Sequence, residues 1–172
     1  MINRENIQIV QGTWEDIEDF IGLLYDVRAG MENKEWFYLD TPEEFRDYMR
    51  SGAMMLWLAR DGDRVAAAFN LLIPELRSYN YGYVLGYSTE DLMKVVNMDT
   101  AAVHPDYRGL GLQRKLLQTA EAWLKGRGER ILLCTIHPEN RFSLENALKQ
   151  GYAVQKQVDI YGSVRYLLRK DI

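Results

Sequence analysis

The sequence predicts an α/β protein of the α+β type, in which a central mixed, twisted sheet is flanked by helices. Three observations support this fold class. Amphipathic helical segments alternate with β-branched and apolar runs along the chain. Two pairs of such runs are separated by short glycine-containing turns, which is typical of β-hairpins. The run over 130–136 is apolar at five of its seven positions, which favours a strand buried in a parallel pairing.

The first elements are a strand over 7–10 and an amphipathic helix. Thr13 and Asp16 indicate the helix start, because Thr is a favoured N-cap and acidic residues suit the first turn. Apolar residues then recur at helical spacing, so we expect one face of this helix to be buried. They are Ile17, Phe20, Ile21, Leu24 and Val27.

A second helix and a hairpin follow. Thr41 and Glu44 form a capping box, and the proline between them fits the first helical position. Strands are then expected over 54–59 and 65–73. The turn around Gly62 joins them as a hairpin.

The segment 74–94 is less regular, and two interpretations of it remain open. Four of the eleven tyrosines of the chain lie here: Tyr79, Tyr81, Tyr83 and Tyr87. Such a segment could line a binding cleft. It could also be a twisted edge strand and loop with half-buried rings, which we favour slightly because aromatic residues suit strands.

The remainder of the chain alternates strands and helices. We expect a strand over 95–103, a helix over about 109–125, a strand over 130–136, a helix over 141–150, and a hairpin of strands over 154–160 and 164–168.

Length and composition indicate one domain over residues 1–172. No apolar run approaches the ~18–20 residues that span a bilayer. The N-terminus lacks the apolar core of a signal peptide, so we expect a cytoplasmic protein. Cys134 is the only cysteine, and its apolar surroundings favour a small buried hydrophobe over a reactive thiol. Nothing indicates a nucleic-acid partner, since no basic run with interleaved aromatics is present.

The net charge of −4 conceals an asymmetry. Residues 1–99 contain nine Lys and Arg against eighteen Asp and Glu, whereas residues 100–172 contain twelve against seven. The basic half suits a polyanionic ligand, and the acidic half suits a cationic one. Equally, both halves could be solvated faces without a partner, because charge governs solubility before function.

The turn after the strand 95–103 has the properties of an anion site. The first N–H groups of a helix lack internal partners, and its dipole adds positive charge there. Gly109 and Gly111 let the backbone approach a ligand closely. Arg108 and Arg114 add forked donors suited to phosphate. The spacing matches neither G-x-G-x-x-G nor G-x-x-x-x-G-K-[ST], so the two familiar phosphate loops are excluded.

This stretch instead resembles the acyl-CoA-binding motif of the GNAT superfamily of N-acyltransferases, V-x-P-x-x-[RQ]-x-x-G-x-[GA]. Val103, Pro105, Arg108 and Gly111 fit it, while Gln113 stands where Gly or Ala is commonest. The alternative is an ordinary strand, turn and helix with helpful glycines. The resemblance implies the GNAT fold, in which two central parallel strands splay apart and acyl-CoA lies between them.

A second stretch resembles the family pattern N-x-x-[AS]-x(7)-G-[FY]. Asn140, Ser143, Gly151 and Tyr152 fit it. The resemblance implies that Asn140 hydrogen-bonds the cofactor, although Asn is also a good N-cap and could fill both roles. Many family members carry a tyrosine seven residues after the asparagine, proposed to protonate the departing thiolate. Here Ala147 occupies that position and can donate no proton.

The resemblance implies an acetyl-CoA-dependent N-acetyltransferase in which a primary amine attacks the thioester directly. The residues implied to bind acetyl-CoA are Ala101, Ala102, Val103, Arg108, Gly109, Leu110, Gly111, Leu112, Gln113, Arg114, Asn140 and Ser143. Ala147 supports a rival function, a catalytically silent CoA-binding sensor or regulatory module. The acceptor and the acyl group stay open, and the C-terminal hairpin could pair across a homodimer.

Candidate acid–base groups are few. The family often places its carboxylate base near Asp99, which lies four residues before Val103 and shares its face of the strand if no bulge intervenes. Asp99 could equally satisfy local backbone N–H groups. His104 and His137 each precede a proline at a strand end. Without clustered Cys or carboxylates they make a poor metal site, so no metal is expected.

Overall fold

The computed structural model describes residues 6–172, which form one seven-stranded sheet in the order β1-β2-β3-β4-β5-β7-β6. The strands are β1 (Ile7–Gln11), β2 (Met54–Asp61), β3 (Arg64–Leu72), β4 (Val95–Val103), β5 (Ile131–Ile136), β6 (Ala153–Ile160) and β7 (Ser163–Asp171). The helices are α1 (Ile17–Ala29), α2 (Pro42–Arg50), α3 (Thr89–Lys94), α4 (Leu112–Lys125) and α5 (Arg141–Lys149). Only β4 and β5 pair in parallel among these strands.

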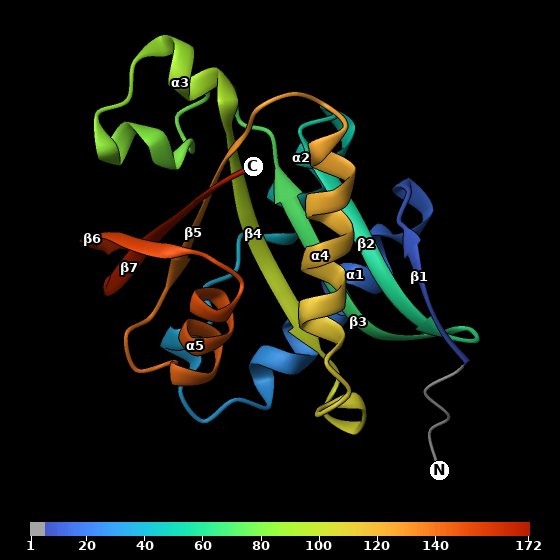
Figure 1. Ribbon diagram of the computed structural model, residues 1–172. Helices are drawn as coiled ribbons and strands as arrows, with labels where there is room; N and C mark the ends of the chain where they lie inside the picture. Colours follow the sequence, from blue (N-terminus) through green and yellow to red (C-terminus); the bar gives the residue numbers. More distant parts are fainter. Residues whose placement is uncertain (1–5) are drawn as a thin grey trace.

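Helices cover both faces of the sheet. Helix α4 crosses one face, and α1 and α2 lie on the other (Figure 1). The α4 side is packed by a cluster that includes Phe69, Leu116 and Leu124. The other side contains Phe20 and Phe45, whose rings meet edge to face at 5.3 Å. Each face therefore has its own apolar layer, and the sheet is fixed between them.

The two parallel strands separate after a short pairing. Their register runs only from Val95 opposite Ile131 to Asn97 opposite Leu133. Beyond it β4 stays paired with β3, and β5 stays paired with β7 (Figure 1). A bulge in β4 accompanies the separation, because Asn70 pairs with Thr100 while Leu71 pairs with Met98. Bulges bend a strand and increase its twist, so β4 turns away from β5 and leaves a cleft between them.

Most predicted elements are confirmed, with two differences. Helix α4 begins at Leu112 rather than about 109, because Gly111 precedes it in a left-handed conformation. The segment 74–94 contains no edge strand: it forms a 3-10 helix, η4 (Tyr81–Leu85), and α3. The side chain of Ser88 caps α3 by accepting from the N–H of Asp91. A serine followed by acidic residues is a helix start, and this signal outweighs the strand preference of the tyrosines.

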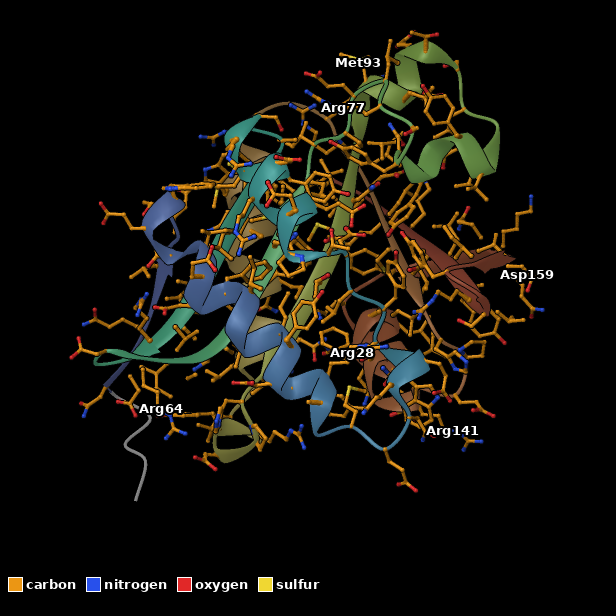
Figure 2. The ribbon with its side chains drawn as sticks, turned by 180° about the vertical axis from the view of Figure 1, so that it is seen from behind. Arg28, Arg64, Arg77, Met93, Arg141 and Asp159 are labelled. Carbon is orange, nitrogen blue, oxygen red and sulfur yellow. The ribbon has the colours of Figure 1, made fainter. Side chains whose placement is uncertain are left out.

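The segment between α1 and α2 passes across the point where β4 and β5 separate, on the side opposite α4 (Figures 1 and 2). It contains the 3-10 helix η3 (Lys34–Trp36). Two arginine side chains hold its backbone: Arg28 donates to the carbonyl of Phe37 at 2.9 Å, and Arg165 donates to that of Glu35 at 2.6 Å. Within residues 6–172, no helix has the length and apolar character needed to cross a membrane.

Candidate active site

The turn before α4 presents a row of unpaired backbone donors. Gly109 and Gly111 have φ angles of 79° and 71°, a left-handed conformation that glycine adopts without strain. The first backbone hydrogen bond of the helix runs from Lys115 to Gly111 at 3.1 Å. Within the described residues, the N–H groups of 109–114 donate to no protein acceptor. These donors and the helix dipole together make an anion-binding cradle.

A cavity of about 610 Å³ opens over this cradle, between the end of β4 and the start of α5. All the residues predicted to bind the cofactor line it except Leu110, which packs against the core on the α4 side. Arg108 and Arg114 make no ion pair with a carboxylate of residues 6–172. Their charges are therefore available to a bound phosphate.

Asn140 caps α5 and also faces the cleft. Its side-chain oxygen accepts from the N–H of Ser143 at 3.3 Å. Both residues line the cavity over the cradle as well as a second, smaller cavity. The predicted cap is confirmed, and the position of Asn140 leaves it able to contact a ligand too.

The second cavity contains two carboxylates and lies where β4 and β5 separate. Asp99 accepts from the amide of Asn70 at 2.9 Å and from the Thr100 hydroxyl at 3.2 Å. Burial raises the pKa of Asp99 to about 6 despite these hydrogen bonds. Burial and the nearby charge of Asp99 raise the pKa of Asp40 to about 7. Both groups are poised to exchange protons near neutral pH.

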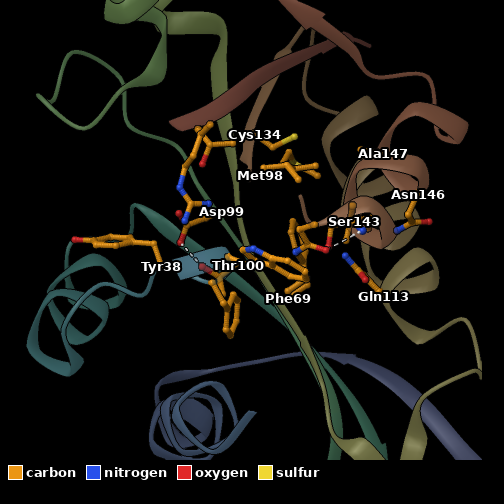
Figure 3. A pocket seen from close by; sticks show the side chains of 18 of the residues that line it. Tyr38, Phe69, Met98, Asp99, Thr100, Gln113, Cys134, Ser143, Asn146 and Ala147 are labelled. Carbon is orange, nitrogen blue, oxygen red and sulfur yellow. Dashed lines mark hydrogen bonds between the residues drawn. The ribbon is translucent and has the colours of Figure 1, made fainter. Parts of the chain in front are cut away.

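The bulge in β4 changes the expected orientation of Asp99. Without a bulge it would share the face of Val103, which packs toward α4. Asp99 is instead the extra residue, and it bonds Asn70 on the face toward α1. The shared face was expected only if no bulge intervened, and the shift in register shows that a bulge does intervene. Figure 3 shows Asp99 across β4 from Gln113 and Ser143.

Aromatic side chains form part of the wall of the second cavity. Tyr38 stacks on Tyr161 with ring centroids 3.9 Å apart, and the hydroxyls of Tyr161 and Tyr81 lie 2.8 Å apart. The sequence did suggest a cleft-lining role for the tyrosine-rich segment, and Tyr81 has that role. The sequence does not single out Asp40, because it directly precedes a helix N-cap, where an acidic residue is common.

The Acetyltransferase (GNAT) family model matches residues 17–152, which is most of the chain. The chain belongs to the GNAT family of acetyltransferases. Its sheet, with one parallel pair splayed inside an otherwise antiparallel arrangement, is the GNAT fold. None of the curated protein sequences compared with the chain is significantly similar to it.

Solved structures share this fold at low sequence identity. NAA60 from Arabidopsis thaliana in complex with acetyl-CoA has a TM-score of 0.73 at 15% identity, over 96% of this chain and 98% of that one. A ribosomal-protein-alanine N-acetyltransferase from Brucella melitensis has 0.72 at 15%, over 96% and 99%. YncA from Salmonella typhimurium, with acetyl-CoA, has 0.66 at 16%, over 96% and 93%.

This GNAT chain has no proton donor at the position of the usual α5 tyrosine. Ala147 lies there, buried at 6% exposure. The neighbouring Tyr152 hydroxyl donates to Glu121 at 3.1 Å and is committed to that carboxylate. Cys134 also lines the second cavity, and burial raises the pKa of its thiol to about 12, which favours the protonated form.

The two histidines have local structural contacts. His104 accepts from the N–H of Asp106 at 3.2 Å, and His137 accepts in the same way from Glu139 at 3.2 Å. His137 also stacks against Trp36, with ring centroids 6.2 Å apart. Neither histidine lines the two cavities of the cleft.

Proposed function

We propose that this GNAT protein moves an acetyl group from acetyl-CoA to the primary amine of a small acceptor, with residues 1–172 acting as one catalytic unit. One observation carries the proposal: the anion cradle and the two carboxylates open into one continuous cleft. Six residues line both of its cavities, namely Phe37, Ala101, Gln113, Asn140, Ser143 and Asn146. The groups suited to phosphate binding and those suited to acid–base chemistry thus lie at the two ends of one site. A reaction between two substrates requires both to be held together in this way.

In this proposal the cradle holds the pyrophosphate of acetyl-CoA. The N–H groups of 109–114 supply aligned donors, and Arg108 and Arg114 supply positive charge. The backbone of 101–103 lies along the cleft, where it would contact the pantetheine arm and the thioester. Asn140 would add a hydrogen bond from the opposite wall.

The reaction proceeds by direct attack. Asp99 takes one proton from the acceptor ammonium, because a protonated amine has no free electron pair. The neutral nitrogen then bonds to the thioester carbon, the carbon–sulfur bond breaks, and its electron pair goes to sulfur. Backbone N–H groups at the splayed strands stabilise the negative charge on the carbonyl oxygen.

The leaving sulfur needs no protein acid in this scheme. With Ala147 in place of tyrosine, it departs as thiolate and takes a proton from water, while the amide nitrogen releases its second proton. A free cysteine thiol has a pKa of roughly 8.5, so a thiolate of this kind is an acceptable leaving group near neutral pH. Ala147 equally favours a rival function, a silent CoA-binding sensor.

Acetyl-CoA binding tests the cradle directly. The double variant Arg108→Ala/Arg114→Ala should lose about 2–4 kcal/mol of binding free energy, because two charge-assisted contacts are removed. Calorimetric titration with acetyl-CoA and desulfo-CoA measures this loss. Arg77→Ala is the control, since Arg77 pairs with Glu75 outside both cavities. Equal affinity in the double variant and the wild type would mean that the cradle does not hold the phosphates.

Thiol release with a panel of amines separates the two functions. Amine-dependent release by the same preparation establishes an acyltransferase. Tight binding of acetyl-CoA without release from any amine of the panel supports the sensor.

A further inference from the structure

Arg165 is a buried cation without a counter-ion. It lies on β7, is 4% exposed and lines the cavity that contains Asp40 and Asp99. One guanidinium nitrogen donates to the carbonyl of Glu35, while Nε is buried and has no hydrogen-bond partner. No carboxylate of residues 6–172 lies within 4 Å of it. Buried charges are normally paired, so this one calls for an anion from outside the chain.

The cavity that Arg165 lines is also lined by two carboxylates, which do not pair with it. Asp40 and Asp99 line it but form no ion pair with the guanidinium. The Arg165 guanidinium lies over the Tyr161 ring, 5.7 Å from its centre, and the Tyr161 hydroxyl shares a hydrogen bond with that of Tyr81. A cavity that keeps opposite charges apart around an aromatic wall is complementary to a dipolar ligand.

The cavity is also small. Its volume is about 120 Å³. An apolar cavity of roughly 150 Å³ holds one benzene molecule, which has six heavy atoms, so only a group of about five or six heavy atoms fits here without movement. The stacked rings of Tyr38 and Tyr161 form part of its lining. A long peptide or polyamine would have to leave most of its length outside.

We propose that the acceptor is a small zwitterion of the amino-acid type, whose carboxylate pairs with Arg165 and whose amine lies against Asp40 and Asp99. This inference rests on the proposed transferase function and adds a substrate class to it. The carboxylate would satisfy the unpaired guanidinium, and the amine would reach the base and the thioester together.

The test compares each amino-acid acceptor with analogues that keep the amine but lack the carboxylate. Thiol release is measured with L-amino acids, their primary amides and the corresponding decarboxylated amines. The amide retains the α-amine and nearly the same size, and it also mimics a peptide N-terminus. The wild type should prefer the acid to the amide by at least tenfold in kcat/KM. In Arg165→Gln the KM for the acid should rise about 10- to 100-fold, with that for the amide little changed.

A matched control separates carboxylate binding from a merely structural role. Arg28 also holds the segment between α1 and α2, through Phe37, but does not line the cavity. Arg28→Gln should therefore keep the preference for acids, and Arg165→Lys should keep part of it. Equal use of acid and amide by the wild type, or an equal KM increase for both in Arg165→Gln, would overturn the inference.

Failure of catalysis is distinguishable from failure of this inference. If no acceptor releases thiol, amino-acid binding to the desulfo-CoA complex is measured by calorimetry instead. Binding that Arg165→Gln abolishes and Arg28→Gln retains supports the carboxylate site, even if the transferase proposal fails. No binding of any amino acid to the wild type would reject the carboxylate site.

Discussion

At the scale of single residues, the two carboxylates of the cleft have different positions and so different expected roles. Asp99 is anchored on β4 by Asn70 and Thr100, beside the splayed backbone. Asp40 comes from the segment that crosses the cleft, and its pKa is raised by burial and then by the charge of Asp99. We therefore assign proton removal to Asp99 and acceptor binding to Asp40.

Kinetics against pH tests this assignment. Asp99→Asn should lower kcat by about 10²- to 10⁴-fold, because general-base catalysis is lost. The acidic limb of kcat/KM near pH 6, which reports the ionisation of Asp99, should disappear. Acetyl-CoA affinity should change little, since Asp99 lies outside the cradle. Stopped assays of thiol release between pH 5 and 9 give the profile.

Asp40→Asn supplies the comparison. It should raise KM for the acceptor more than it lowers kcat, and it should keep the limb near pH 6. If the acidic limb of kcat/KM is still present in Asp99→Asn but is absent in Asp40→Asn, the two roles are reversed. An unchanged rate in Asp99→Asn at every pH would remove Asp99 from the mechanism.

Local sequence signals located one part of the site and not the other. The cradle was predictable because its determinants are contiguous: a strand, two glycines, two arginines and a helix start within 103–114. The acceptor side was not, because Asp40 and Arg165 come from segments 125 positions apart and match no motif. Only the tertiary fold brings them together.

At the scale of elements, a buried polar network joins α4 to β7 and to the end of α5. Glu121 is 5% exposed; it accepts from the Tyr152 hydroxyl at 3.1 Å and pairs with Lys170 at 2.6 Å. The network fixes α4, and with it the cradle, against the strand that carries Arg165. Its tyrosine is the motif residue that follows Gly151.

Glu121→Ala should therefore destabilise the fold by about 2 kcal/mol, because Lys170 and Tyr152 would lose their buried partner. Urea unfolding measures the change. The control is Glu145→Ala on α5, whose 3.8 Å pair with Lys149 is exposed to solvent and should contribute less than about 0.5 kcal/mol. A similar small loss for both variants would show that the network does not anchor α4.

The elements themselves followed from local patterns wherever capping and periodicity agreed. The capping box at Thr41 and the hairpin around Gly62 formed as predicted. The bulge at Asp99 did not follow from the sequence, because register depends on the partner strand rather than on β4 alone. The edge strand expected in the tyrosine-rich segment is wrong, because the helix start at Ser88 outweighs the strand preference of the rings.

At the scale of the whole molecule, the charge asymmetry of the chain corresponds to its cleft. The cradle arginines come from the basic half, and both cavity carboxylates come from the acidic half. Arg165 is the exception, since it brings a basic-half charge into the acidic cavity. Burial of these charges without ion pairs between them costs stability and organises a site, as is common in active sites.

This cost predicts how stability depends on pH. The pKa values of Asp99 and Asp40 lie above the ordinary 3.8, at about 6 and about 7, so the folded protein binds more protons than the unfolded chain between pH 4 and 7. Their contribution to the free energy of unfolding is therefore complete below about pH 4 and is lost as the pH rises toward 7.

Asp99→Asn removes the ionisable group while keeping its shape. The variant should match the wild type near pH 4 and exceed it by up to about 3 kcal/mol at pH 8. Urea unfolding at pH 4, 5, 6, 7 and 8 measures the difference, with Asp63→Asn in the exposed β2–β3 turn as a control that should show none. An Asp99→Asn variant that is less stable than the wild type at pH 8 would mean that the Asn70 and Thr100 hydrogen bonds outweigh the cost of burying the charge. A variant that gains stability while losing activity would show that the molecule retains a destabilising carboxylate for its chemistry.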